Sequence, residues 1–392
     1  MYERRLPDFI DSFMEYTDNS EAPAVFRKWV AVSIVAAVMQ RKCWLAWDTI
    51  TYPNMYIILV GPSGCRKNTA MNPAQEILRA IGMPLASESI TREALIKELN
   101  EHEYSAVTAD GRAITHSSMT IFAKELTVFL GYDNRQLIMD LTDWYDCDDS
   151  WTYRTKGSGT NSIIGVWVNM LGGTTPTLLN STLTSEAASG GLTGRMIFVY
   201  AGKKGKSVPF PHLLKVNDNL RGDIINDLNT IAMMGGEFKI DEDFFNEYAK
   251  WYPQYEQNPP FHDDRLAGYV ERRPKHMLKL AMILSASRSD SRIMTVADMH
   301  KADALLREIE VNMPRVVAGI GKSDIGDIVT RVLTEIASNK SMLRSELMAR
   351  HYNDVDRDGL NRVLATLSAM GKVKIEAIQG GDVRLTYDGK NG

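Results

Sequence analysis

The chain has 392 residues, of which 44% are hydrophobic and 24% are charged, and its formal net charge is −4. This length predicts two or three domains with a substantial core. The slightly negative charge excludes a global basic field, so any nucleic acid would have to be held by local basic patches. Cys43, Cys65 and Cys147 are widely separated and lack metal-ligand spacing, which indicates a reducing cytoplasm and no zinc site.

Residues 1–50 are expected to form a helical collar. Pro7 and Pro23 are each placed to open a helix, and the apolar residues that follow each proline have helical spacing. The apolar run 29–39 is too short to span a bilayer and predicts a buried helix. The charged start of the chain carries no cleavable signal, so we expect a cytoplasmic protein without a membrane partner.

Residues 51–215 show a different pattern. Short apolar runs at 56–60, 119–122, 163–171 and 196–200 alternate with helical segments. Strands that are buried on both faces and separated by helices predict a parallel α/β sheet. Helices are expected again over 216–320, and 319–323 has the composition of a linker.

Residues 55–69 read Met-Tyr-Ile-Ile-Leu-Val-Gly-Pro-Ser-Gly-Cys-Arg-Lys-Asn-Thr and are the most informative stretch. An apolar strand ends in a glycine-rich turn, and a lysine opens the helical pattern that follows. Backbone N–H groups and the positive end of a helix surround a phosphate in such a loop, and the lysine adds a point charge. We expect ATP and Mg²⁺ to bind here. The expected binding residues are Gly61, Pro62, Ser63, Gly64, Cys65, Arg66, Lys67, Asn68 and Thr69.

The loop departs from the pattern G-x-x-x-x-G-K-[ST] at two positions. Arg66 stands where the second glycine is expected, and Asn68 stands where the Mg²⁺-binding hydroxyl is expected. Two arrangements of the metal site remain open: Thr69, one residue later, reaches the metal, or Asn68 binds it through its amide oxygen. An ordinary strand–turn–helix junction is the alternative to a nucleotide site.

Three residues join Lys67 as catalytic candidates. Glu125 follows the run 119–122 and either orients water and Mg²⁺ or is a helix N-terminal acid. Asn169 lies near the carboxyl end of an expected strand, where it either meets a ligand or is a satisfied buried amide. Arg195 follows a glycine-rich loop and is either an arginine finger for a neighbouring subunit or a surface arginine.

Residues 325–388 have the order of a winged helix-turn-helix. Three helical patterns at 325–338, 343–350 and 356–370 precede two alternating strands at 372–378 and 383–387. Basic and acidic residues are nearly balanced in this segment, so it either contacts nucleic acid or docks a protein.

Six basic residues are candidates for contact with DNA. Arg154 and Lys156 belong to a loop region, 152–161, that is expected to face DNA in a channel. The other four lie on the third helix and beside the wing of the C-terminal segment. They are Arg357, Arg362, Lys372 and Lys374.

The order of these motifs resembles the phage- and prophage-encoded P-loop ATPases related to the helicase portion of primase–helicase proteins, which have a RecA-like core. The likeness covers roughly residues 5–310 and rests on the segments 21–23, 52–67, 123–126, 171–176 and 190–195. It implies that Lys67 and Thr69 bind nucleotide and metal, that Glu125 acts in hydrolysis, and that Arg195 acts between the subunits of a ring. In relatives a small residue often follows the loop lysine, and here that position is Asn68.

The sequence therefore predicts an α/β protein with a RecA-like P-loop NTPase core (51–215), flanking helical segments (1–50 and 216–320) and a C-terminal winged helix-turn-helix (325–388). The expected function is an ATP-dependent DNA helicase or translocase of a phage or mobile element, acting in replication or recombination in the host cytoplasm. The expected partners are single-stranded or forked DNA, further copies of the chain in a hexameric ring, and a replication protein. The alternatives are an ATP-binding initiator, loader or regulator that does not unwind DNA, and a degenerate ATPase that serves as a scaffold.

Overall fold

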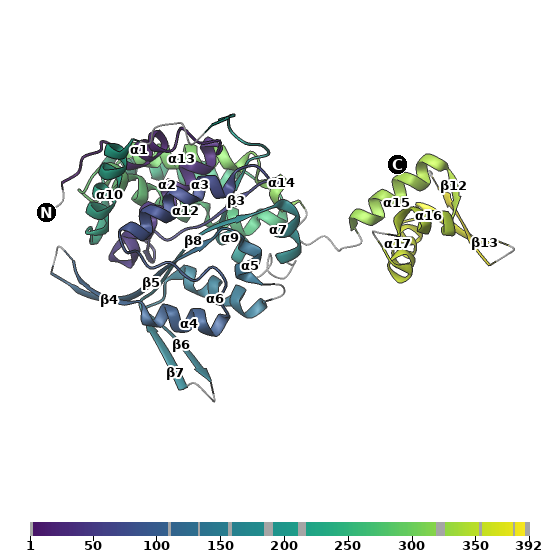
Figure 1. The fold of residues 1–392 in the computed structure, drawn as a ribbon, viewed down its shortest axis with the longest axis horizontal. Coiled ribbons are helices and arrows are strands. Elements are labelled where there is room, and N and C mark those ends of the chain that lie inside the picture. The colour runs from purple at the N-terminus through teal and green to yellow at the C-terminus, as the bar shows by residue number, and fades with distance from the viewer. Residues whose placement is uncertain are drawn as a thin grey trace. The chain divides into compact units, whose positions relative to one another are not determined.

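The computed structural model describes residues 3–108, 111–131, 134–155, 159–183, 191–210, 217–318, 326–352, 355–378 and 381–388. The chain has a mixed α/β fold and divides into two compact units, Met1–Ile320 and Gly321–Gly392 (Figure 1). The segments expected separately at 1–50, 51–215 and 216–320 are parts of the first unit and share one apolar core. No helix within the described ranges is long and apolar enough to span a membrane.

A five-stranded sheet organises the first unit, in the order β4-β5-β8-β3-β9. β5, β8, β3 and β9 run parallel, and β4 is antiparallel at one edge. Every residue of β3 and β8 is buried, which explains why these strands are continuous apolar runs and not alternating patterns. The strands are β3 (Tyr56–Val60), β4 (Glu103–Val107), β5 (Ala113–Ala123), β8 (Val166–Thr174) and β9 (Met196–Tyr200).

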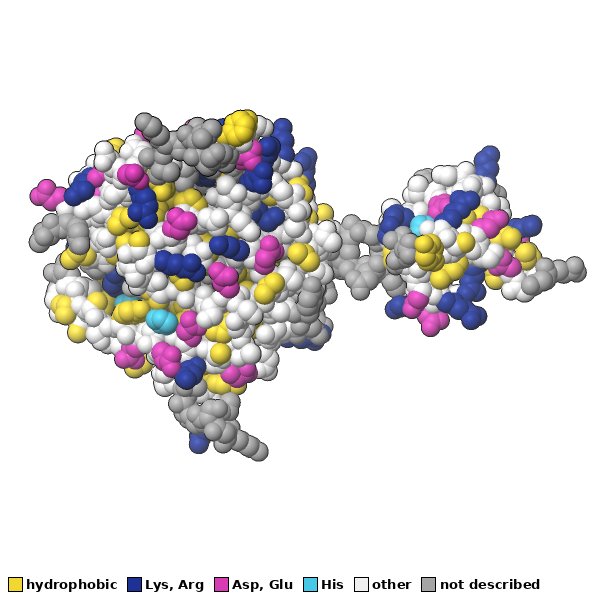
Figure 2. All heavy atoms as spheres, in the orientation of Figure 1, with side chains coloured by type: hydrophobic (Ala, Val, Ile, Leu, Met, Phe, Trp, Pro, Cys, Tyr) yellow, Lys and Arg dark blue, Asp and Glu magenta, His cyan; other side chains and the backbone are white. Residues whose placement is uncertain are grey.

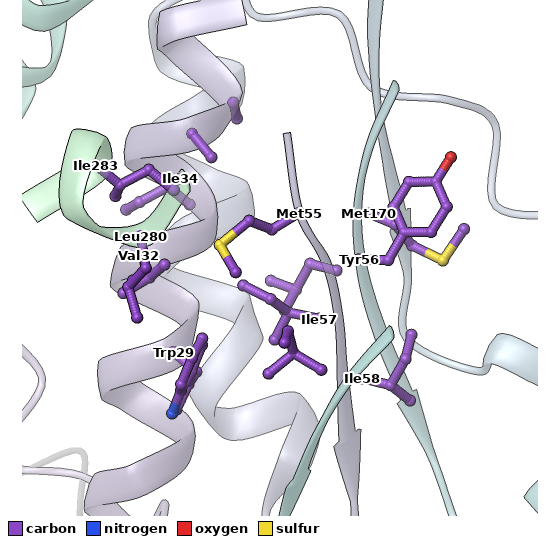
Figure 3. Packing of buried hydrophobic residues seen from close by; sticks show 14 of the residues in the cluster. Trp29, Val32, Ile34, Met55, Tyr56, Ile57, Ile58, Met170, Leu280 and Ile283 are labelled. Atoms are coloured by element: carbon purple, nitrogen blue, oxygen red, sulfur yellow. The ribbon is translucent and has the colours of Figure 1, made fainter. Parts of the chain in front are cut away.

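The helix α2 (Ala24–Met39) is an internal layer of this core. Figure 3 shows Trp29, Val32 and Ile34 of α2 beside Leu280 and Ile283 of α12 (Ala267–Arg288) on one face of β3. Met55 and Ile57 point toward this face, whereas Tyr56 and Ile58 point to the other. A helix that is buried on all sides is apolar all round, which agrees with the expectation of a buried helix at 29–39.

A second sheet, in the order β11-β10-β1-β2, contains twelve residues from the two segments that were expected to be helical. The expectation of wholly helical segments at 1–50 and 216–320 was therefore wrong. β1 pairs in parallel with β10 through Cys43 and Gly236, so the pairing that stabilises these strands is far away in sequence. The strands are β1 (Cys43–Ala46), β2 (Ile50–Thr51), β10 (Gly236–Ile240) and β11 (Ile293–Met294).

The remaining elements of the first unit surround these two sheets. A hairpin is formed by β6 (Ser150–Thr155) and β7 (Gly159–Ile164). The helices are α1 (Phe9–Tyr16), α3 (Lys67–Ala80), α4 (Arg92–Glu101), α5 (Leu126–Leu130), α6 (Arg135–Asp146), α7 (Pro176–Thr182), α9 (Leu192–Arg195), α10 (Asp218–Ala232), α11 (Glu242–Gln257), α13 (Val296–Glu310) and α14 (Met313–Val317).

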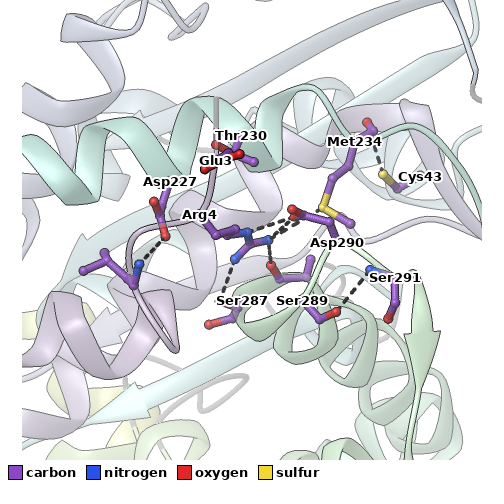
Figure 4. Close-up of polar contacts among 12 residues, drawn as sticks. Glu3, Arg4, Cys43, Asp227, Thr230, Met234, Ser287, Ser289, Asp290 and Ser291 are labelled. Atoms are coloured by element: carbon purple, nitrogen blue, oxygen red, sulfur yellow. Dashed lines mark hydrogen bonds and ion pairs between the residues drawn. The ribbon is translucent and has the colours of Figure 1, made fainter. Parts of the chain in front are cut away.

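The segment before α1 is hydrogen-bonded to residues of α10 and to the end of α12, which lie more than 200 residues later in the chain (Figure 4). The guanidinium of Arg4 donates hydrogen bonds to the carbonyl of Ser287 at 2.8 Å and to Asp290 at 2.9 Å. The carboxylate of Asp227 accepts the backbone N–H of Leu6 at 2.9 Å. These bonds join the start of the chain to α10 and to the end of α12, so the N-terminal helices are integral to the unit.

The second unit has its own apolar core, which includes Val332, Leu360 and Leu385. The three helices and two strands expected from the sequence are confirmed, and β12 (Ser341–Leu343) adds a third strand in the order β12-β14-β13. Asp356 caps the third helix by accepting the N–H of Gly359 at 2.7 Å. The expected linker at 319–323 lies outside the described residues. The elements are α15 (Gly326–Asn339), α16 (Arg344–His351), α17 (Arg357–Ala369), β13 (Val373–Ala377) and β14 (Val383–Tyr387).

Candidate functional site

The glycine-rich loop 61–66 joins the interior strand β3 directly to helix α3. Gly61 donates its N–H to the carbonyl of Thr174 at 3.2 Å, which holds the start of the loop against the end of β8. A Cβ atom at Gly61 would lie 2.4 Å from the carbonyl oxygen of Ala201 and 2.5 Å from Sγ of Cys65. Gly64 has a φ of +83°, a conformation that glycine adopts without steric cost. The loop therefore requires glycine at both positions.

Lys67 is the first residue of α3, and its side chain folds back over the loop. It is 9% exposed, and Nζ donates to the carbonyl of Gly61 at 2.8 Å and to that of Pro62 at 3.3 Å. Cys65 donates its N–H to Pro62 at 3.3 Å and closes the turn below the amine. The first N–H groups of a helix point out of its N-terminus without intrahelical acceptors. The loop thus places an ammonium group beside converging backbone donors, which is the chemistry of an anion site.

Arg66 adopts the backbone conformation that a glycine would adopt at this position. Its φ is 68° and its ψ is 32°, in the left-handed region. Its Nε donates to Oε2 of Glu21 at 2.8 Å, and Lys204 donates to Oε1 of the same carboxylate at 2.6 Å. Hydrogen bonds from Lys204 and the N–H of Val208, followed by Arg66, lower the pKa of Glu21 to about 2.

Asn68 and Thr69 occupy the first turn of α3 next to Lys67. Asn68 is exposed and Thr69 is half-buried. Both side chains carry an oxygen of the kind that Mg²⁺ prefers. Their placement leaves both arrangements of the metal site open.

Glu125 lies at the same edge of the sheet as the loop. It follows the end of β5, whose last residue, Ala123, pairs with Gly172 of β8. A Cβ atom at Gly173 would lie 2.8 Å from the carbonyl oxygen of Lys124 and 3.5 Å from Sδ of Met71 in α3. The absence of a side chain at Gly173 therefore lets the segment that carries Glu125 approach the helix that follows the loop.

The carboxylate of Glu125 is exposed. Glu125 is the residue before the first turn of α5, in an extended backbone conformation, and no capping bond is recorded between its side chain and the described residues of that helix. Glu125 therefore stands at the N-cap position of α5, but among the described residues its side chain does not make the hydrogen bond by which a residue caps a helix. An exposed, uncapped carboxylate remains available to a ligand at this edge.

Asn169 does not belong to this site, and the expectation of a catalytic role is corrected here. Its Oδ1 accepts the N–H of Met55 at 3.0 Å, and its Nδ2 donates to the carbonyl of Ser33 at 3.2 Å. It is fully buried and lies beside the start of β3, about 16 Å along the strand from the loop. The buried-amide alternative describes these contacts, because each polar atom of the amide has a partner within the core.

Arg195, like Asn169, lies near the start of β3 and not at the carboxyl ends of the strands, where the loop lies. It ends α9 directly before β9, whose first residue, Met196, pairs with Tyr56. The side chain is 9% exposed and forms an ion pair with Asp146 of the same chain. Its Nη1 donates to the carbonyl of Gly191 at 3.1 Å. An arginine finger must project toward another subunit, so the expected role is not supported by this buried, intramolecular placement.

A buried polar cluster lies near Arg195 and was not expected from the sequence. Nζ of Lys279 donates to Oδ1 of Asn54 at 2.7 Å and lies 3.9 Å from the ring centre of Tyr145. Burial lowers the pKa of Lys279 to about 7. His276 accepts or donates a hydrogen bond with the Tyr145 hydroxyl at 3.1 Å. His276 also bonds the carbonyl of Gly194 at 3.0 Å through Nε2, so the cluster joins α12 to α6, to α9 and to the segment before β3.

The basic residues expected to contact DNA are dispersed. On the face of the first unit shown in Figure 2, basic and acidic side chains are interspersed. Arg154 is exposed on β6, whereas Lys156 lies outside the described residues. In the second unit, Arg357 and Arg362 are exposed on α17.

The two lysines beside the expected wing differ in their surroundings. Lys374 is exposed and lies 3.4 Å from the carboxylate of Asp388. Lys372 is half-buried. An acidic neighbour reduces the net positive potential that Lys374 presents to a phosphate.

Sequence reasoning missed three residues that border the loop. Thr174 ends β8 beside Gly61, Glu21 contacts Arg66, and Lys204 contacts Glu21. The apolar run at 163–171 puts Asn169 near the end of the expected strand, whereas β8 extends to Thr174. Although the segment 21–23 is part of the resemblance, no local pattern pairs Glu21 with Arg66 or Lys204, because these residues come together only through the packing of the segments before α2 and after β9.

A scan of the sequence against protein-family models finds no matching family, and a search of curated proteins finds no match. The functional proposal below therefore rests on the arrangement of the residues described above.

Proposed function

We propose that the chain is a P-loop nucleoside triphosphatase with a RecA-like core. The observation that carries the proposal is the position of Lys67 across a glycine-rich loop between an interior parallel strand and a helix. Ligands of open α/β sheets bind at the carboxyl ends of the strands, and both the loop and Glu125 lie at that edge. ATP would bind with its phosphates on residues 61–69, and Lys67 would exchange its carbonyl contacts for the outer phosphates.

The strand order supports the placement of the acidic residue. One strand, β8, separates the loop strand β3 from β5, which Glu125 follows. Glu125 would orient the attacking water, and Thr69 or Asn68 would hold Mg²⁺, which neutralises charge on the phosphates when bound. Thr174, beside Gly61, would contact the outer phosphate in addition to Lys67.

Hydrolysis would drive a homo-oligomeric helicase or translocase on DNA, as the resemblance to phage ATPases implies. The second unit would act as a winged helix-turn-helix, with Arg357 and Arg362 directed to phosphates. The hexameric ring, the host cytoplasm and a replication-protein partner belong to the same proposal.

One observation favours the second candidate, an ATP-binding initiator, loader or regulator that does not unwind DNA. Arg195 is engaged with Asp146 of its own chain, so this residue does not offer the intersubunit contact through which a motor couples its subunits. A loader needs nucleotide binding and DNA association but no such coupling.

Steady-state phosphate release from ATP, with and without single-stranded DNA, tests the proposal. We expect the wild type to hydrolyse ATP, and Lys67→Ala to lose both hydrolysis and nucleotide binding. Normal turnover by Lys67→Ala would overturn the assignment of the site. Displacement of a strand from a forked substrate then separates the two candidates, because a loader binds the fork without opening it.

A further inference from the structure

In the loop 61–66, Arg66 is the residue with a side chain that adopts a positive φ, a conformation that favours glycine. With a φ of 68°, it adopts a left-handed conformation that is strained for an L-residue, whereas glycine adopts it freely. An unsupported arginine would therefore shift residues 61–66 toward other conformations. In those conformations the backbone donors no longer converge with Lys67.

The side chain of Arg66 has a fixed partner outside the loop. Nε and Nη2 both approach Oε2 of Glu21, at 2.8 Å and 2.6 Å. Glu21 lies in the turn between α1 and α2, and its side chain is 15% exposed. This geometry directs two N–H groups of one guanidinium to one carboxylate oxygen, which restricts where the backbone of Arg66 can lie.

Glu21 is itself held from a second side. Its Oε1 accepts Nζ of Lys204 at 2.6 Å and the N–H of Val208 at 3.1 Å, and its carbonyl accepts the N–H of Gly205 at 2.9 Å. A Cβ atom at Gly205 would lie 3.0 Å from the carbonyl of Ala22, so the two segments are in close contact. The carboxylate that Arg66 meets is thus a rigid anchor and not a free surface group.

We propose that Glu21 is a positioning residue for the phosphate-binding loop, and that its carboxylate holds Arg66 in the left-handed conformation that glycine adopts at this position unaided. The inference rests on the proposed function, since it treats residues 61–69 as the nucleotide site. It assigns to a residue outside the loop the task that the second glycine performs in the standard pattern.

A double-mutant cycle with Glu21→Gln and Arg66→Gly tests this assignment. Glu21→Gln keeps the shape of the side chain and removes its charge. In the wild-type background we expect it to raise the dissociation constant for ATP with Mg²⁺ by about fivefold. In the Arg66→Gly background we expect a change of less than about twofold, because glycine needs no anchor. Arg66→Gly alone supplies the background in which residue 66 needs no anchor, and the effect of Glu21→Gln is measured relative to it.

The matched control is Lys206→Gln. Lys206 belongs to the same segment as Lys204 but pairs with Asp18 at 3.0 Å, so its loss should leave ATP binding unchanged. Equal effects of Glu21→Gln in both backgrounds, or no effect in the wild type, would overturn the proposal. The first result would mean that Glu21 acts on the fold, and the second that Arg66 needs no anchor.

Amide hydrogen exchange at residues 63–69, measured without nucleotide, separates this inference from the proposed function. We expect Glu21→Gln to speed exchange in the loop when residue 66 is arginine and not when it is glycine. If the effect of Glu21→Gln on exchange depends on residue 66 but the chain does not bind ATP, the proposed function is refuted and the positioning role of Glu21 is intact. If the wild type binds ATP but the effect of Glu21→Gln on exchange and on affinity is the same with arginine and with glycine at residue 66, the positioning role alone is refuted.

Discussion

Gly173→Ala tests whether the close approach at the end of β8 places Glu125. The added Cβ would lie 2.8 Å from the carbonyl oxygen of Lys124, the residue directly before Glu125. To reach ordinary van der Waals contact at 3.4 Å, that oxygen must move by about 0.6 Å. The neighbour is backbone and cannot rotate away, so the displacement is passed to Glu125.

The size of the effect follows from this displacement. Overpacking of this kind costs about 1–3 kcal/mol of stability, and a misplacement of about 1 Å at a reacting centre can cost on the order of a hundredfold in rate. We therefore expect kcat for ATP hydrolysis to fall by about tenfold. KM should change by less than about twofold, because the added Cβ meets the carbonyl of Lys124, whereas the contacts of Lys67 are with the carbonyls of Gly61 and Pro62 in the loop itself.

Phosphate release and thermal unfolding, measured on the same preparations, check this expectation. Gly222→Ala is the control, since no atom lies within 4 Å of the added Cβ in the exposed face of α10. It should raise stability by about 0.5–1 kcal/mol and leave kcat unchanged. A Gly173→Ala chain that unfolds at a lower temperature but keeps the wild-type kcat would refute the link between this contact and Glu125.

Three further outcomes are expected. Between pH 7 and about 10, the unfolded chain binds more protons at Lys279 than the folded chain, because burial lowers its folded pKa to about 7; the contribution of Lys279 to the free energy of unfolding should therefore rise with pH, so in urea titrations the wild type should gain stability relative to Lys279→Met across this range. Mixtures of Lys67→Ala and Arg195→Ala chains should hydrolyse ATP no faster than the average of the two, because Arg195 is paired within its own chain; recovery of activity on mixing would show that it acts between subunits. Arg362→Gln should reduce the slope of DNA affinity against salt by about 1, whereas Arg350→Gln should not, since Arg350 is paired with Glu335 at 2.7 Å; equal slopes for the two variants would exclude Arg362 as a phosphate contact.

Local patterns predicted the secondary structure well where an element is long or completely buried. β3 and β9 have the expected bounds, and α2 is the expected buried helix. The short strands β1 and β10 escaped prediction because four or five residues contain too little periodicity to distinguish a strand. Their pairing depends on contacts between residues far apart in the chain.

The residues of the candidate site likewise differ in whether a local pattern identifies them. Lys67 and the glycines of the loop are recognisable from sequence because the chemistry of the loop is local: consecutive residues supply the turn, the N–H groups and the charge. Asn169 was misjudged because the strand ends at Thr174, five residues further on, which moves Asn169 from the edge of the sheet into its core. A shift of a strand boundary is enough to exchange a ligand position for a core position.

The amino-acid sequence by itself determined the α/β class, the loop at 61–69, and the three helices and two of the strands of the second unit, since each depends on periodicity or on neighbouring residues. Tertiary structure alone decided which side chains surround that loop. Glu21 contacts Arg66 from a segment about 45 residues away in sequence, Lys204 contacts Glu21 from about 180 residues away, and Arg195 turns inward to Asp146. Such contacts arise from the packing of segments that carry no local signal of one another, and packing is a property of the folded chain as a whole.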